Sequence, residues 1–307
     1  MEKYVIEKDE VKKLIAFCGY GHYPTAKIAF MGNEEGLDGY EHKYGIKARV
    51  EVFGKHSDTY LGESWTDGYY EHIERVAPLF ATRVKELGGA KKESKRNSPM
   101  VEFQARLMLS IEQGCSKDWF LKKREDTENI YEEITDYHSN RETGLYTRNA
   151  TIGSALLDLR PFPRRMEGLR KNKWPYENIT ETQYMKAMSF EPYKLEAMYQ
   201  ELRDTRAEYL TRAIQSSSFS ILIGIGDKKA KTRFFEQYFG AKFYQDKKIP
   251  LSKDRVEVHI SEPLDNGMVI ILSDFFQHGR GIGLKGLRKL RRDIIQPYIK
   301  KLVPNLH

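Results

Sequence analysis

Three short polar segments of this 307-residue chain carry side chains that suit hydrolytic chemistry. They are Gly32–Gly36 (GNEEG), Asp158–Phe162 (DLRPF) and Ser273–Gly279 (SDFFQHG). A carboxylate can orient a water molecule and balance developing positive charge, and a histidine can stabilise a departing anion. Each segment alone would more often be an ordinary turn, but all three follow apolar runs. Their shared position predicts one polar site.

Four short apolar runs supply the elements that would position these segments, near residues 28–31, 153–158, 219–225 and 268–272. They are rich in Ile, Leu and Val, and helical patterns separate them. This combination is typical of a parallel sheet that is covered on both faces. Ligands bind such sheets at the carboxyl ends of the strands. We therefore expect the three polar segments to meet at one edge.

The whole chain, residues 1–307, is predicted to form a single α/β domain. We expect three αβα layers around a central, mostly parallel, four-stranded sheet. The stretch 45–148 has mainly helical spacing, interrupted by a polar, Gly-led loop at 88–98. It is predicted to be a large, mainly helical insertion within that domain.

The basic residues are unevenly distributed along the chain. Lys and Arg number 51 against 44 Asp and Glu, which gives a formal net charge of +7. The excess gathers in Lys91–Arg96, Arg160–Lys173 and Lys285–Lys301. Such clusters favour phosphate binding, although many basic runs are only solvated faces. The distribution points to a nucleic-acid partner.

Composition excludes several other classes. The N-terminal MEKYVIEKDEVKK is charged and has no apolar signal core, and no run of about 18 apolar residues occurs. Cys18 and Cys115 form neither a disulfide framework nor a zinc cluster, and the histidines lack ligand spacing. We expect a cytoplasmic monomer with no metal, no cofactor and no membrane association.

The three polar segments together resemble the motifs of the uracil-DNA glycosylase superfamily. The resemblance covers about residues 26–40, 150–166 and 218–295. It implies a uracil-DNA-glycosylase-like fold and a DNA glycosylase that flips a pyrimidine out of single- or double-stranded DNA. Such an enzyme hydrolyses the N-glycosidic bond and leaves an abasic site.

The first segment departs from the family pattern in an informative way. Glu34 stands where the family has Asp or Asn, so the resemblance makes it the catalytic residue that positions water. Glu35 replaces the usual Pro and is a competing candidate for that role. Gly36 occupies the place of a Tyr that blocks the pyrimidine 5-carbon in the uracil-restricted branch. Asn33 belongs with Gly36 among the expected base-recognition residues.

Asp158 stands where the family has an Asn that reads the base. An ionised Asp only accepts hydrogen bonds, which suits the exocyclic amino group of cytosine. With the space left by Gly36, this predicts a 5-modified cytosine, such as glucosylated hydroxymethylcytosine. The alternative is that Asp158 caps a turn or pairs with Arg160 or Arg164.

The third segment carries the expected second catalytic residue, His278, which would stabilise the departing base. Asp274 lies closer to the strand end and is the alternative. The turn that follows leads into a basic helix, where Ile282 or Leu284 could fill the gap left by a flipped nucleotide. The expected DNA-binding residues are Arg164, Arg165, Leu284, Lys285, Arg288 and Lys289.

The functional prediction is therefore a DNA glycosylase acting on modified cytosine, with a role in defence against phages that carry such bases. Aromatic residues near the start of the insertion could wall a pocket for a sugar substituent: Tyr40, Tyr44, Tyr60, Trp65, Tyr69 and Tyr70. Uracil repair and a catalytically inactive nucleic-acid-binding relative remain alternatives. Gly281-x-Gly283-x-x-Gly286 matches a nucleotide-binding pattern, but too little chain follows for a dinucleotide unit.

Overall fold

The structure is a computed structural model that describes most of the chain. The described residues are 3–37, 40–61, 82–89, 99–114, 117–122, 129–140, 142–147, 150, 152–164, 174–250, 255–276 and 282–302.

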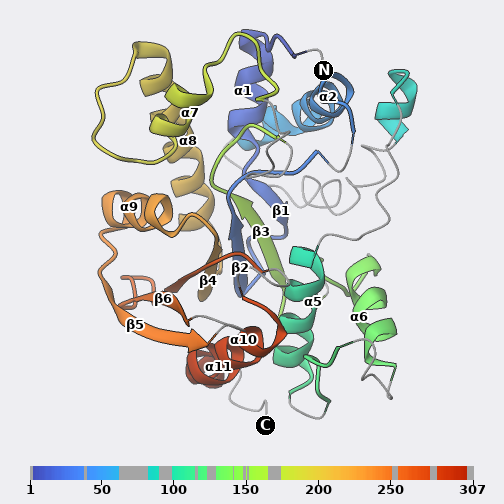
Figure 1. The fold of residues 1–307 in the computed structure, drawn as a ribbon, viewed down its shortest axis with the longest axis vertical. Coiled ribbons are helices and arrows are strands. Elements are labelled where there is room, and N and C mark those ends of the chain that lie inside the picture. The colour runs from blue at the N-terminus through green and yellow to red at the C-terminus, as the bar shows by residue number, and fades with distance from the viewer. Residues whose placement is uncertain are drawn as a thin grey trace.

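A seven-stranded mixed sheet forms the centre of the molecule, in the order β1-β3-β2-β4-β7-β6-β5 (Figure 1). Its inner four strands run parallel: β3 (Ser154–Asp158), β2 (Ile28–Gly32), β4 (Ile221–Ile225) and β7 (Val269–Ser273). The four predicted strands are thus confirmed as neighbours. All four are buried along their whole length, which explains their continuous apolar sequences.

The prediction of a four-stranded sheet is wrong, because three antiparallel strands extend it. They are β1 (Gly19–Gly21) beside β3, β6 (Arg255–Ser261) beside β7, and β5 (Phe243–Pro250) beside β6. The strand β1 has only three residues, two of them glycines, and β5 is largely polar. Neither has the apolar run that marks the inner strands, so hydrophobicity alone does not reveal them.

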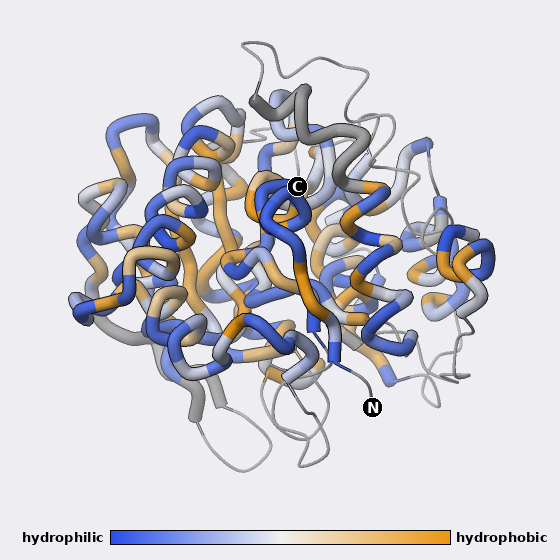
Figure 2. The backbone as a smooth tube through the Cα atoms, turned by 90° about the horizontal axis from the view of Figure 1, so that it is seen from above, coloured by the Kyte–Doolittle hydropathy of each residue, from blue (hydrophilic) through white to orange (hydrophobic). Residues whose placement is uncertain are grey.

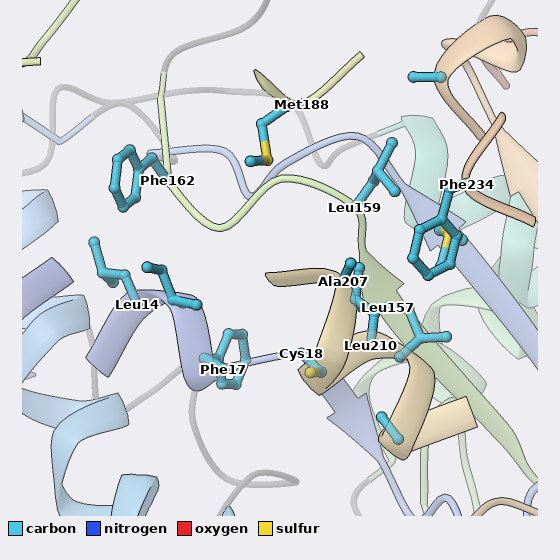
Figure 3. Close-up of a cluster of buried hydrophobic side chains, with 14 of the residues drawn as sticks. Leu14, Phe17, Cys18, Leu157, Leu159, Phe162, Met188, Ala207, Leu210 and Phe234 are labelled. Carbon is cyan, nitrogen blue, oxygen red and sulfur yellow. The ribbon is translucent and has the colours of Figure 1, made fainter. Parts of the chain in front are cut away.

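Alternate residues of the inner strands face two separate cores. Met31 and Leu157 belong to the first core, together with residues of α1 (Lys8–Ala16), α7 (Glu181–Ala187), α8 (Ala197–Gln215) and α9 (Lys228–Phe239). Figure 3 shows part of this core, where Ala207 and Leu210 of α8 lie close to Leu157 of the sheet.

The second core lies on the opposite face and receives Phe30 and Leu156 from the sheet. Its helices are α5 (Pro99–Glu112), α6 (Ile130–Ser139), α10 (Leu284–Lys289), a π-helical segment (Leu290–Ile295) and α11 (Gln296–Leu302). Helices on both faces give the three layers that the sequence predicts. Figure 2 shows helical turns of the molecule whose colour alternates between hydrophobic and hydrophilic, as in amphipathic covering helices.

The described part of residues 45–148 is helical rather than stranded. Besides α5 and α6 it contains α2 (His42–Leu61), which packs against α1, and a helical turn at residues 82–86. Because α5 and α6 supply buried residues to the second core, this region helps to build the domain itself. Within the described part of the chain, no helix combines the length and apolarity needed to cross a bilayer.

Candidate functional site

The polar segments after β2 and β3 lie side by side at the carboxyl ends of the strands. Gly32 pairs with Asp158 in the parallel register. Beyond the strands, the Arg160 N–H donates to the Asn33 carbonyl at 2.6 Å, and the Arg164 N–H donates to the Glu35 carbonyl at 3.1 Å. The expectation that these two segments meet is therefore confirmed.

Glu34 is the centre of a buried ion network. Its Oε2 lies 2.8 Å from Arg160 Nη1, and its Oε1 lies 2.7 Å from Arg164 Nε. The Glu34 side chain is only 7% exposed. Arg160 also pairs with Asp227, and Arg164 also pairs with Glu181 at 3.0 Å. Such pairing is what allows charges to be buried beside a sheet edge.

Glu35 is held by different partners from those of Glu34. The Tyr20 hydroxyl donates to Glu35 Oε1 at 2.7 Å, and Arg49 Nε lies 3.1 Å from the same oxygen. Arg49 comes from α2, is fully buried, and also donates to the Gly36 carbonyl at 2.6 Å. Gly36 itself is exposed, and no atom of the described residues lies within 4 Å of where its Cβ would be. Tyr20 and Arg49 thus fix the turn at residues 32–36, which is exposed at Gly36.

Lys231 of α9 joins the ends of β2 and β4. Its Nζ donates to Asn33 Oδ1 at 2.6 Å and to the Ile225 and Gly226 carbonyls at 3.1 and 2.7 Å. Three acceptors match the three donors of an ammonium group. Burial lowers the pKa of Lys231 to about 7, an effect that Asp227 opposes. Because its donors are all used, Lys231 orients the Asn33 amide and fixes the strand ends.

Asp158 is the buried carboxyl of this site that lacks such support. It ends β3 and is 5% exposed, and no hydrogen bond to its carboxyl oxygens occurs among the described residues. Burial, reinforced by Glu35, raises the pKa of Asp158 to about 7, although Arg206 and Lys231 oppose the shift. Perturbed carboxyls with this combination of burial and like charge are typical of functional sites.

The arginines around Asp158 bind other groups rather than its carboxyl. Arg206 of α8 donates to the Ile15, Phe17 and Leu159 carbonyls at 2.7, 2.6 and 3.2 Å, and to the Asp158 main-chain carbonyl. Arg160 and Arg164, the partners considered for Asp158 from sequence, bind Glu34 instead. The structure therefore places Asp158 beside an arginine-rich network, and within the described part of the chain it has no ion pair of its own.

The third polar segment follows β7 at the same edge. Asp274 pairs with Lys228 of α9 at 3.1 Å. Phe275 is 37% exposed, and its ring lies so close to Gly226 that a Cβ there would come within 2.5 Å of it. Gly226 also has a φ of +71°, so both its conformation and this contact require glycine. His278 and Arg165 lie outside the described residues.

The expected DNA-binding residues fall into two groups. Lys285 and Arg288 are exposed on α10, Lys289 is partly exposed, and Arg288 pairs with Asp118 at 2.5 Å. The side chains of Ile282 and Leu284 are instead buried in the second core, so neither protrudes as a wedge. Arg164 is 8% exposed and bound to two carboxylates, so it supports Glu34 rather than an open phosphate site.

Several site residues were not identified from the sequence, namely Tyr20, Arg49, Asp227 and Lys231. A signal for two of them is nevertheless present. Arg49 lies three residues after Ile46 on the buried face of α2, and Lys231 precedes Phe234 and Phe235 on the buried face of α9. A basic residue on an apolar helical face must find buried partners, which is a cue for such a network.

Within the described residues, no group of three or more His, Cys, Asp or Glu side chains is arranged to hold a metal ion. Comparison with known proteins gave no match to the chain, whether among family models, curated proteins or solved structures.

Proposed function

We propose that this chain is a DNA glycosylase that hydrolyses the N-glycosidic bond of a flipped-out pyrimidine, with a 5-modified cytosine as its substrate. The observation that carries the proposal is the pairing of two buried carboxyl groups in opposite environments. Glu34 is held by two arginines, whereas Asp158 has a raised pKa and forms no ion pair with any described residue. Carboxyl pairs with contrasting environments are the machinery with which proteins split glycosidic bonds.

Each carboxyl has a distinct role in this proposal. Glu34 faces the sugar and orients water toward the anomeric carbon. A carboxylate has about four acceptor positions, so two arginine contacts leave room for a water molecule. The arginines keep the water-binding oxygens in fixed positions, as preorganised catalysis requires. Asp158 faces the base, at the place where the resemblance puts the base-reading residue.

The open space at Gly36 supports a substrate with a bulky 5-substituent. Genomes of some bacteriophages carry large 5-substituted cytosines that host DNA lacks, so an enzyme of this kind would create abasic sites only in invading DNA. Of the aromatic residues expected to wall the substituent, Tyr40 is buried in a small cluster with Ala48 and Val84. The side chains of Tyr60, Trp65, Tyr69 and Tyr70 lie outside the described part of the chain.

Formation of abasic sites on defined DNAs tests the proposal. The panel holds glucosylated hydroxymethylcytosine, hydroxymethylcytosine, uracil and a thymine mismatch, each in single- and double-stranded DNA. We expect release from the modified cytosines. Glu34→Gln should lower the rate at least about 100-fold, since it removes the charge that balances the sugar cation, and should leave DNA affinity within a few fold.

The matched control is Glu181→Gln, because Glu181 binds the same Arg164 but is half-exposed at the end of the network. It should retain most of the activity. Near-full base release by Glu34→Gln would refute the assigned role. Efficient release of uracil with none of any modified cytosine would make uracil repair the function.

A nucleic-acid-binding protein without catalytic activity is the second candidate. It is favoured by the pairing of both Glu34 and Glu35 with arginines, since ion pairs can serve stability or shape alone. The same panel separates the two functions. Tight DNA binding with no abasic sites on any substrate would establish the binding protein.

A further inference from the structure

Among the described residues, several titratable or charged groups interact with Asp158, and none of them forms an ion pair with its carboxyl. They come from β1 and the residue before it, the turn after β2, α8, α9 and the segment before β3: Cys18, Tyr20, Glu34, Glu35, Arg206, Lys231 and Tyr146. Burial raises the pKa of Cys18 to about 11 and those of both tyrosines well above their ordinary range. All three are therefore uncharged at neutral pH.

Of the remaining neighbours, Glu34 and Glu35 favour a neutral Asp158, whereas Arg206 and Lys231 oppose it. Glu34 and Glu35 are like charges, and each is held in place by its own arginine contacts. The guanidinium of Arg206 donates to four main-chain carbonyls, and the ammonium of Lys231 donates to Asn33 and two carbonyls. A buried carboxyl without a donor, beside two carboxylates, holds its proton more tightly than one in water.

A neutral carboxyl changes what this position offers to a base. It has one O–H donor and one carbonyl acceptor, whereas an ionised carboxylate has acceptors only. The Watson–Crick edge of cytosine presents the N3 lone pair beside the N4 amino group. The O–H can therefore donate to N3 while the carbonyl accepts from N4, which forms a two-bonded pair that an ionised Asp158 would not make.

We propose that Asp158 is the general acid of the reaction and protonates N3 of the cytosine as the base departs. This inference rests on the proposed function. The C1′–N1 bond breaks and its electron pair goes to the base, while the proton moves from Asp158 to N3. The base leaves as a neutral tautomer instead of an anion. Water adds its hydroxyl to C1′ and gives up one proton, which restores Asp158.

The proposal separates cytosine from uracil. Uracil already carries a proton on N3 and must leave with its negative charge, so transfer from Asp158 is not part of its departure. Asp158→Asn retains one donor and one acceptor but has no transferable proton. A residue that only recognised the base would tolerate this substitution, whereas a proton donor would not.

The experiment measures single-turnover base release from DNA with glucosylated hydroxymethylcytosine, from about pH 5 to about pH 9. For the wild type we expect a plateau below the Asp158 pKa of about 7 and a tenfold fall per pH unit above it. Asp158→Asn should be at least about 100-fold slower on this DNA and lack that fall. Its DNA affinity should stay within a few fold.

A change in the substrate tests the same step without altering the protein. When carbon replaces N3 of the target base, the wild type should release it at least about 100-fold more slowly, because the proton has no acceptor. The measurement with the carbon analogue tests proton transfer to N3 even if Asp158→Asn fails to fold. Equal release of the carbon analogue, or full activity of folded Asp158→Asn, would overturn the inference.

The outcomes also separate this inference from the function on which it rests. If the wild type releases no base from any DNA, both are wrong. If it releases modified cytosine with a rate that does not fall above neutral pH, the glycosylase stands and Asp158 is not its acid. If uracil is the only base released, the proton-transfer step is also refuted.

Discussion

Asp158 is a residue whose environment costs folding stability. Arg49, Arg206 and Lys231 each make several hydrogen bonds that satisfy their buried donors. The Asp158 carboxyl has no such bond among the described residues, yet it is 5% exposed at the end of a central strand. Natural proteins retain costly buried groups chiefly at functional sites, where activity and stability conflict.

This cost predicts that the stability of the folded protein depends on pH through Asp158. The folded-state pKa of Asp158 is raised to about 7 from an ordinary value of 3.8. Below the lower value the group is neutral in both states. As the pH rises toward 7 the unfolded chain ionises first, so the folded state loses stability across that window and does not regain it above.

At about pH 8, the free energy of unfolding of Asp158→Asn should therefore exceed that of the wild type by roughly 2 to 4 kcal/mol. The variant should unfold at a higher denaturant concentration. At about pH 4 the two proteins should differ little. Urea unfolding followed by circular dichroism measures both. Asp204→Asn, at an exposed position of α8, is the control and should show no such dependence. A difference of equal size at both pH values would mean that Asp158 is not neutral in the folded protein.

At the scale of elements, helices fix the ends of the strands through buried cations. Arg206 of α8 joins the end of α1 to the end of β3, since it donates to the Ile15 and Phe17 carbonyls and to those of Asp158 and Leu159. Lys231 does the same between β2 and β4. Strand ends leave carbonyls without ladder partners, and these side chains satisfy them.

Arg206→Met should destabilise the fold by about 3 to 5 kcal/mol, because it leaves buried carbonyls without donors while keeping an unbranched apolar stem in place of the arginine stem. The free energy of unfolding in urea measures the effect. Arg212→Met is the matched control on the same helix, since Arg212 is exposed and its ion pair is an i,i+4 contact with the exposed Glu208. The control should cost under about 0.5 kcal/mol. Equal effects of the two changes would show that Arg206 does not hold these elements together.

The elements differ in how well the sequence reveals them. The inner strands are buried on both faces, so their apolar runs mark them directly, and the rule that ligands bind at strand ends places Glu34 and Asp158 together. The short β1 has no such pattern, and Arg49 and Lys231 reach the site from helices that are distant in sequence. Such long-range partners have no local signature beyond a charge on an apolar face.

At the scale of the whole molecule, the proposed function requires DNA to approach the carboxyl edge of the sheet. The start of α10 is tied to the segment after β7, because the Ile282 N–H donates to the Phe275 carbonyl at 2.9 Å. Lys285 and Arg288 are exposed on that helix, next along the chain to the candidate site. Arg288 is paired with Asp118, which a phosphate would have to displace.

Charge reversal of both residues, Lys285→Glu with Arg288→Glu, should weaken binding to DNA of any sequence. The slope of log affinity against log salt should fall by about two units in magnitude, because two phosphate contacts are lost. Binding measured by fluorescence anisotropy over a range of salt concentrations gives both quantities.

The control reverses Lys12 and Arg212, exposed on α1 and α8 of the opposite helical layer, and keeps the change in net charge equal. A long-range effect of net charge would weaken both double variants alike, whereas direct phosphate contact lowers the slope only for the α10 pair. If the α10 variant keeps its affinity and its salt dependence, DNA follows another surface.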